Sequence, residues 1–507
     1  MQNKILIAGH VSLDPLGRHA ISFLKTLLNN PKNDVYIEKS YLLNKYDTLN
    51  EFFVDDIKSG RLKFSDSVGY DFPFDFLIFT DSISLSPGQL WESRSFEWNA
   101  KIKICYPVYD GSVPPLHWID VINCFDICLC TSNYCIHNLR RYGVSIDCFC
   151  LECAVLIENF LKIKPFQRNE KFRFGSIGAS DFRKNMPLLM RSFSQAFSKQ
   201  DNVELFIHSS YGKDITCDDD ILKVYEECKQ KSNITLQLKK ISHEEMTDLW
   251  ASFDAYISPQ TTTGYFTTPL EACAVGLPVI LSDIHPHLEL KKFIPEENNL
   301  FFVKHGKIST AFHWVFDYRE LGCKFDADES EYVQAFKTVY SRQKDLSTSK
   351  LIKQRKDNAY KITAEALSPL YNYLINPRKV ALAKTVSHLD ADGTFFMSEK
   401  LAKKYEAFGF GKFADVKDLY QETIYPEEQD PVFQALERTA VESQKIWLKL
   451  YEKRNLVTSQ YGINGSKWMK KLLRRSETSG VTRLPRFIYK AFSLYCKTKT
   501  LFTRKKH

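Results

Sequence analysis

The stretch FDAYISPQTTTGYFTTPLEACAVGLPVILSD, which forms residues 253–283, decides the fold of this chain. Its two short apolar runs, at 256–258 and 279–281, are typical of strands that are buried on both faces. A short helix is predicted between them. A strand, a helix and a second strand make a βαβ unit, so the stretch predicts a parallel sheet.

The loop and the helix inside this unit carry signals of their own. The polar loop 260–268 runs up to Pro269, a residue that helices accept in their first turn, and a short helix follows over 270–274. Gly276 and Pro278 end that helix. Backbone N–H groups are free where a loop opens onto a helix N-terminus, so this junction predicts an anion site.

Glu271 lies one turn inside the helix, where its carboxylate can accept hydrogen bonds from hydroxyl groups. The stretch resembles the nucleotide-sugar signature of retaining GT-B glycosyltransferases of family 4, approximately E-G-F-G-x-x-x-x-E-A-x-A-x-G-x-P-V-I. The resemblance implies that Glu271 holds the ribose hydroxyls of a nucleotide. It also implies that the loop faces the diphosphate and the donor sugar through Gly264, Tyr265, Phe266 and Thr267.

A second motif follows a strand predicted over 172–178. Arg183 and Lys184 come after this strand and before a helix that runs through residue 197. Family 4 also has a glycine-ended strand followed by a basic pair, and the resemblance implies that Arg183 and Lys184 neutralise the donor diphosphate as catalytic groups. Fixed cations stabilise the charge that phosphoryl oxygens gain as the nucleotide leaves. A solvated surface pair is the alternative interpretation.

The N-terminal half resembles the other Rossmann-like domain of such enzymes. It opens with a strand over 4–9 and a helix over 18–28, without the G-x-G-x-x-G of a dinucleotide site. Gly17 lies where family 4 has a glycine-rich loop near the donor phosphates, and an ordinary loop glycine is the alternative. Asp110, which follows a strand over 103–108, corresponds to an acidic residue of the family and implies a catalytic or acceptor-binding group; a solvated turn aspartate is the alternative.

The length of 507 residues predicts two domains with an appendage. We place an N-terminal Rossmann-like acceptor-side domain at 1–165 and a Rossmann-like nucleotide-sugar donor domain at 166–350. A helix over 351–379 is expected to cross back to the first domain, and 380–507 is expected to be a mainly helical accessory region. The predicted fold class is therefore α/β, of GT-B type, with two domains facing a cleft.

Two features of the composition bear on localisation. No run approaches eighteen apolar residues, so no spanning helix is expected, and the first apolar run is interpreted as a strand and not as a signal peptide. Thirteen cysteines, an odd number without a secretion signal, indicate reduced thiols in the cytoplasm.

We expect neither a metal nor a cofactor, with the nucleotide sugar bound as a substrate. Only Cys150 and Cys153 have the C-x2-C spacing of a zinc site, and small buried hydrophobic residues are the better interpretation of the cysteines. The acidic run 218–220 precedes a predicted helix, whose N-terminus favours negative charge without a metal.

Basic residues gather at the end of the chain. Residues 466–507 contain thirteen Lys or Arg and one acid, whereas the whole chain has a net charge of +8. Cationic amphipathic segments with aromatic residues bind anionic membrane surfaces. We therefore expect this tail to bind the inner face of a membrane and expect no nucleic-acid partner; a nucleic-acid arm and a solvated tail are the alternatives. One helical face of the tail is formed by Phe487, Ile488, Ala491, Phe492 and Tyr495.

The expected function is transfer of a sugar, with retention, from a nucleotide-diphosphate donor to a saccharide or lipid-linked saccharide acceptor in glycan or surface polysaccharide synthesis. Two alternatives stay open. Thr263 stands where the family has its first Glu, which usually contacts the transferred sugar, and this difference favours a catalytically impaired pseudo-glycosyltransferase that binds ligands or acts as a scaffold. A different GT-B chemistry, such as that of an epimerase or a phosphorylase, is the second alternative.

Overall fold

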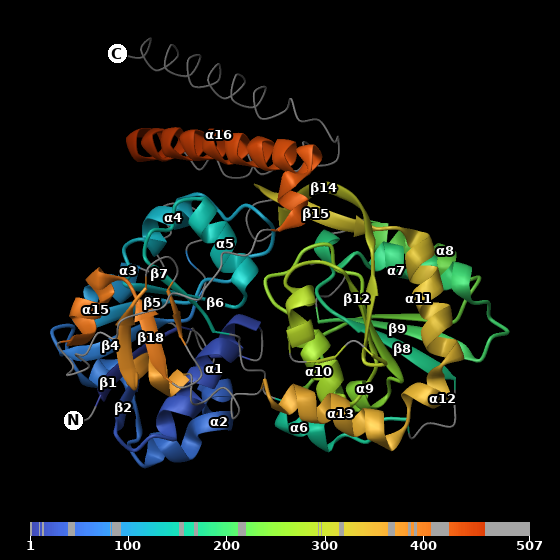
Figure 1. Cartoon of the computed structure of the whole chain (residues 1–507), viewed down its shortest axis with the longest axis horizontal. Helices are drawn as coiled ribbons and strands as arrows, with labels where there is room; N and C mark the ends of the chain where they lie inside the picture. Colours follow the sequence, from blue (N-terminus) through green and yellow to red (C-terminus); the bar gives the residue numbers. More distant parts are fainter. Residues whose placement is uncertain are drawn as a thin grey trace, which may run out of the picture.

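The computed structural model shows two α/β lobes side by side, with a C-terminal extension that reaches over both of them (Figure 1). It describes residues 3–461 apart from 10, 13–14, 39–45, 82, 84–92, 152–156, 167–170, 211–219, 293, 296, 314–318, 363–370, 384–386, 390–392 and 407–424.

The first lobe is built on a seven-stranded sheet in the order β3-β2-β1-β4-β5-β6-β7. All of its paired strands are parallel. The central strands are apolar runs whose side chains are buried on both faces, as a parallel sheet between two layers of helices requires. The strands are β1 (Asn3–Ala8), β2 (Asn33–Ile37), β3 (Leu62–Phe64), β4 (Phe74–Phe79), β5 (Ala100–Cys105), β6 (Ile127–Cys130) and β7 (Asp147–Cys150).

The second lobe is built on a six-stranded sheet in the order β10-β9-β8-β11-β12-β13, again with parallel pairing. It contains the βαβ unit that the sequence predicts, and the two parallel sheets confirm the predicted fold class. The strands are β8 (Phe172–Ile177), β9 (Val203–Ser209), β10 (Ile234–Leu238), β11 (Ala255–Ser258), β12 (Val279–Ser282) and β13 (Leu300–Val303).

Helices cover both faces of each sheet (Figure 1). Those of the first lobe are α1 (Pro15–Leu28), α2 (Tyr46–Lys58), α3 (Ser93–Glu97), α4 (His117–Ile122) and α5 (Asn133–Arg141). The next helix, α6 (Glu158–Lys162), packs on the second lobe (Figure 1). Those of the second lobe are η3 (Phe182–Lys184), α7 (Met186–Ala196), α8 (Asp220–Cys228), α9 (His243–Ala251), α10 (Thr267–Val275), η5 (His287–Lys292), α11 (Glu329–Ser341), α12 (Gln343–Leu346) and α13 (Ser349–Tyr360).

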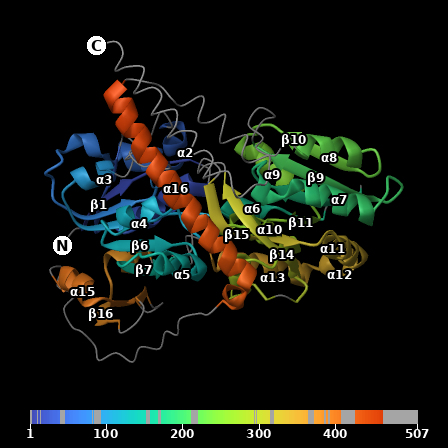
Figure 2. The same cartoon turned by 90° about the horizontal axis from the view of Figure 1, so that it is seen from above.

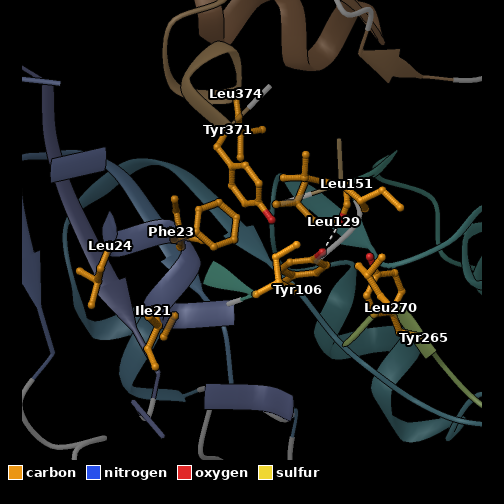
Figure 3. Packing of buried hydrophobic residues seen from close by; sticks show 14 of the residues in the cluster. Ile21, Phe23, Leu24, Tyr106, Leu129, Leu151, Tyr265, Leu270, Tyr371 and Leu374 are labelled. Carbon is orange, nitrogen blue, oxygen red and sulfur yellow. Dashed lines mark hydrogen bonds between the residues drawn. The ribbon is translucent and has the colours of Figure 1, made fainter. Parts of the chain in front are cut away.

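The largest hydrophobic core extends from one lobe into the other (Figure 3). In the first lobe, the ring of Phe23 packs edge-to-face against Tyr106 and Tyr371, with centroid distances of 5.9 and 4.7 Å. Tyr265 and Leu270 of the second lobe belong to the same cluster. The lobes therefore share buried apolar surface.

An antiparallel hairpin follows the second sheet and was not predicted from the sequence. It consists of β14 (His305–His313) and β15 (Arg319–Ala327). The carbonyl of Leu321 in β15 accepts a 3.0 Å hydrogen bond from the backbone N–H of Val113 in the first lobe. The hairpin is thus a second connection between the lobes.

The C-terminal region contains a small sheet as well as the helices that were predicted. Its order is β16-β18-β17, and α15 (Glu399–Glu406) follows it. The sheet sits on the first lobe, where Asp147 of β7 accepts a 2.7 Å hydrogen bond from the N–H of Ser398. Its strands are too short for an alternating pattern to mark them: β16 (Lys379–Leu382), β17 (His388–Leu389) and β18 (Thr394–Met397).

The chain crosses back from the second lobe to the first between α13 and Tyr371. α13 packs on α10 in the second lobe, and Tyr371 then contacts Phe23 of α1 in the first. Part of the predicted crossing helix over 351–379, residues 363–370, lies outside the described residues.

A long helix, α16 (Pro431–Tyr461), lies across both lobes after a short turn, η7 (Pro426–Gln429) (Figure 2). Gln444 contacts both sides: its side-chain oxygen accepts from the N–H of Leu116 at 2.8 Å, and its amide donates to the carbonyl of Glu320 at 2.9 Å. No helix among the described residues is long and apolar enough to cross a bilayer.

Candidate functional site

The loops that follow the carboxyl ends of the two parallel sheets carry the predicted site residues. In the first lobe, Asp110 follows β5 and Thr131 follows β6; in the second, η3 follows β8 and the loop 260–266 follows β11. Open α/β sheets bind their ligands at this edge. The Gly264 N–H donates to the Asp110 carboxylate and the Gly264 carbonyl accepts from the Thr131 hydroxyl, so the two sets of loops face each other.

α10 places Glu271 where the two lobes meet. The helix contains Pro269 in its first turn and ends at Gly276, whose φ of 98° is a left-handed conformation that glycine adopts without strain. Glu271 is 3% exposed, and its carboxylate forms an ion pair with the guanidinium of Arg18 in α1. A buried carboxylate requires a charged or hydrogen-bonding partner, which Arg18 supplies from the other lobe.

Thr263, which stands where the family has a glutamate, is turned into its own loop. Its hydroxyl donates to the carbonyl of Tyr265 at 2.6 Å and accepts from the N–H of Tyr265 at 3.3 Å. The rings of Tyr265 and Phe266 stack with a centroid distance of 4.2 Å and are both buried. Thr263 therefore shapes the loop, and the Tyr265 amide that was expected to face the diphosphate donates to Thr263 in this structure.

Gly264 is held between groups of the first lobe. Its N–H donates to the Asp110 carboxylate, and its carbonyl accepts from the Thr131 hydroxyl at 2.7 Å. A Cβ at this position would lie 2.5 Å from the carbonyl oxygen of Tyr109, which no side chain tolerates. Only glycine permits this approach, so the signature glycine closes the loop against the first lobe.

The basic pair predicted from the sequence lies in η3. Asp181 caps this turn, since its carboxylate accepts from the N–H of Lys184 at 3.2 Å. The Arg183 guanidinium lies 3.2 Å from the Asp110 carboxylate and 3.3 Å from that of Asp181. The carbonyl of Arg183 also accepts from the N–H of Thr261 at 2.9 Å. The structure thus brings Arg183 and Asp110 together and ties both to the loop that leads into α10.

Lys184 has an unusually low pKa. Burial, followed by the positive charge of Arg183, lowers the pKa of Lys184 to about 7. Its side chain lies along Gly178, where a Cβ would be 3.1 Å from Cδ of the lysine. Lys184 is therefore poised to change charge near neutral pH.

Donor binding is expected to take up a proton at Lys184. An anionic diphosphate favours the ammonium form and raises the pKa of Lys184 above its value of about 7 in the free protein. The dissociation constant of a nucleotide sugar should therefore rise by up to about tenfold per pH unit above pH 7, until the pKa of the bound state is reached. Isothermal titration with UDP-glucose between pH 6 and 9 measures this, because a diphosphate esterified at both ends does not itself titrate there.

The Lys184→Arg variant is the matched control, because arginine keeps its charge over the whole range. Its affinity for UDP-glucose should be flat with pH. A pH dependence that is the same in both proteins would assign the titration to another group.

Gly17 lies in the first turn of α1, next to Arg18. A Cβ on Gly17 would lie 2.1 Å from the hydroxyl oxygen of Ser12 and 2.3 Å from its backbone nitrogen. Close packing against the β1–α1 loop explains this glycine, and the same packing delivers Arg18 to Glu271. Contact with the donor phosphates stays a prediction for Gly17.

Arg18 and Thr131 were not predicted from the sequence, and neither were the contacts of the histidines after β12. His287 is fully buried; its Nδ1 lies 3.1 Å from the carbonyl oxygen of Ser282, and burial lowers its pKa to about 3. His285 pairs with Glu427 of η7 at 3.2 Å. Arg18 with Glu271, Thr131 with Gly264 and His285 with Glu427 are pairs more than a hundred residues apart, so no local pattern could have found them.

No group of three or more His, Cys, Asp or Glu side chains that could hold a metal ion is found in the part of the chain that the structure describes. Cys150 is described, whereas Cys153 lies in 152–156, outside it. Ten cysteines are described as free thiols, and the Sγ atoms of Cys128 and Cys130 lie 3.9 Å apart. Of the acidic run 218–220, only Asp220, the first residue of α8, is described.

Comparisons with known proteins agree with this geometry. Residues 171–313 match the family described as group 1 glycosyl transferases. No curated protein matches the chain significantly.

Among solved structures, the chain is similar to Anabaena HepE in complex with UDP and glucose, with a TM-score of 0.52 and 11% identity over 74% of this chain and 99% of that one. It is also similar to sucrose-phosphate synthase from Thermosynechococcus elongatus, with a TM-score of 0.50 and 13% identity over 74% of this chain and 98% of that one. The match to TarM has a TM-score of 0.46 and 13% identity and covers 62% of this chain but only 56% of TarM.

Two parallel-sheet lobes whose carboxyl-end loops face each other define the GT-B class. Within that fold, residues 171–313 of the second lobe match the group 1 glycosyl transferase family.

Proposed function

We propose that the protein transfers a sugar from a nucleotide-diphosphate donor to a hydroxyl of a saccharide or lipid-linked saccharide acceptor, with retention of configuration. The observation that carries the proposal is the joining of two motifs: Thr261, in the loop before α10, donates to the carbonyl of Arg183. That bond fixes the basic pair to the loop that leads to Glu271.

Each group has a role that follows from its chemistry. Glu271 accepts from the ribose hydroxyls, while Arg183 and Lys184 bind the diphosphate. As the bond from sugar to phosphate breaks, negative charge builds on the leaving diphosphate, and cations already in place lower the barrier. HepE, a structural neighbour, was solved with UDP and glucose, which supports a donor of this kind.

A nucleotide-release assay tests transfer. We expect UDP or another nucleoside diphosphate to be released from the matching nucleotide sugar much faster when an oligosaccharide acceptor is present, and NMR of the product should show the anomeric configuration of the donor. Binding of the nucleotide sugar without release would favour a pseudo-glycosyltransferase. Release without a glycosylated product would indicate a different GT-B chemistry, and an inverted product would overturn retention.

We further propose that the protein works in glycan or surface polysaccharide synthesis at the inner face of a membrane, held there by the basic tail. The tail, 466–507, lies outside the described residues, so its sequence alone supports this: thirteen Lys or Arg against one acid. Each basic residue near an anionic surface contributes about 1 kcal/mol.

Deletion of residues 466–507 is expected to abolish co-sedimentation with vesicles of anionic phosphatidylserine, while turnover of a soluble acceptor is retained. Vesicles of neutral phosphatidylcholine provide the control, because they lack the charge that attracts the tail. Vesicle binding that survives the deletion would show that another surface is the anchor. Retention of nucleic acid by the full chain but not by the truncated one would support the nucleic-acid arm instead.

A further inference from the structure

Asp110 occupies two of the groups that are proposed to bind the donor diphosphate. Its carboxylate lies 3.2 Å from the Arg183 guanidinium and accepts the N–H of Gly264. A guanidinium and a loop N–H are also the donors that bind phosphate oxygens in proteins. A carboxylate has the negative charge and the two acceptor oxygens needed to take the place of a phosphate at such donors.

A side chain of the first lobe also takes the place of a ligand at Glu271, the group proposed to bind the ribose. Glu271, which is proposed to accept from ribose hydroxyls, receives the guanidinium of Arg18 instead. Asp110 and Arg18 both come from the first lobe, and Arg183 and Glu271 both come from the second. In the free protein, Asp110 of the first lobe therefore takes the place of a phosphate at Arg183, and Arg18 takes the place of ribose hydroxyls at Glu271.

We propose that Asp110 is an internal competitor of the donor diphosphate: it holds Arg183 and the Gly264 amide until a donor displaces it, and so sets the affinity of the site for nucleotide sugars. This rests on the proposed function and goes beyond it. The role differs from proton transfer or acceptor binding, because it acts on the free protein before any sugar is bound.

The backbone around Asp110 keeps the competitor in place. Tyr109 is buried, and its hydroxyl donates to the carbonyl of Cys135 at 3.3 Å. On the other side, a Cβ on Gly111 would lie 2.4 Å from the carbonyl oxygen of Leu321 in the hairpin. Since the segment is packed on both sides, a donor must break the contacts of the Asp110 side chain to reach Arg183.

The test compares nucleotide affinity with and without the charge on Asp110. An Asp110→Asn variant should bind UDP, and also inorganic pyrophosphate, about tenfold more tightly than the wild type, the factor expected if the site is occupied by Asp110 nine-tenths of the time. Pyrophosphate has neither base nor ribose, so it reports on the diphosphate groups alone.

Glu204→Gln is the matched control. Glu204 also pairs with an arginine, Arg173, at 2.7 Å, but it lies at the amino-terminal end of its strand, opposite the carboxyl-end loops that carry the site. This variant should bind both ligands like the wild type. Unchanged or weaker binding of UDP and pyrophosphate by Asp110→Asn would overturn the proposal, whatever happens to turnover.

A second variant covers the case in which Asp110→Asn does not fold. Thr131→Val removes the other polar contact of the first lobe to Gly264, a 2.7 Å hydrogen bond, and keeps the shape of the side chain. Because this loosens the hold of the first lobe on the loop that Asp110 contacts, UDP binding should tighten about twofold to threefold. Unchanged binding would count against the proposal that Asp110 competes with the donor. If the wild type binds no nucleotide at all, the proposed function fails; if it binds and neither variant binds more tightly, only this inference fails.

Discussion

An Arg183→Ala variant is expected to transfer sugar about 10²–10³ times more slowly than the wild type, the loss that follows removal of one fixed donor to a developing negative charge. Arg183 is held by Asp110 and Asp181 and by the backbone bond from Thr261, so its guanidinium is oriented before the donor arrives. Initial rates of nucleoside diphosphate release at saturating donor measure the effect as kcat.

Arg173→Ala is the control for that variant. Arg173 pairs with Glu204 near the start of β8, in the same lobe but at the opposite end of the sheet from the site loops, so its loss should leave kcat near the wild-type value. Arg183→Lys keeps the charge but not the bidentate geometry of a guanidinium, so its kcat should lie between those of Arg183→Ala and the wild type. Equal rates for Arg183→Ala and the wild type would remove Arg183 from the chemistry.

A Glu271→Gln variant is expected to bind the donor nucleotide more weakly by about 1–3 kcal/mol, because hydrogen bonds to the ribose hydroxyls are lost or weakened. The change keeps the size of a side chain that is only 3% exposed, so it tests the charge and not the packing. Isothermal titration with UDP gives the affinity directly.

The ribose assignment is tested by pairing this variant with 2′,3′-dideoxy-UDP. The wild type should prefer UDP over the dideoxy nucleotide, and that preference should disappear in Glu271→Gln, as a double-mutant cycle requires of groups in contact. If the variant keeps the full preference, Glu271 does not hold the ribose.

Sequence reasoning succeeds where the signals are local. The run from β11 to β12 was predicted strand by strand because its apolar segments, Pro269 and Gly276 all lie within about thirty residues. The same holds for β8 and α7, with Arg183 between them shortly after the strand. Predicting the two Rossmann-like lobes required these repeated patterns together with the resemblance to family 4 glycosyltransferases.

The partners of the site residues could not be predicted in that way. Arg18 and Glu271 are 253 positions apart, and Asp110 reaches Gly264 across 154. The hairpin β14–β15 packs against α16, more than a hundred residues later in the chain. Periodicity reports which residues are buried but not which lobes meet, so the contacts that give Asp110 and Arg18 their roles emerge only from the tertiary structure.

The central claim, that the facing loops of the two lobes form a nucleotide-sugar site, is tested most directly by thermal denaturation of the purified protein with a panel of nucleotides and nucleotide sugars. A ligand at a hundredfold over its dissociation constant adds about 2.7 kcal/mol to the free energy of unfolding, enough to shift the melting temperature clearly. We predict a shift with one nucleoside diphosphate and its sugars, and a smaller shift at the same ligand concentration in Glu271→Gln. A folded wild-type protein whose melting temperature does not move with any member of the panel would contradict the account.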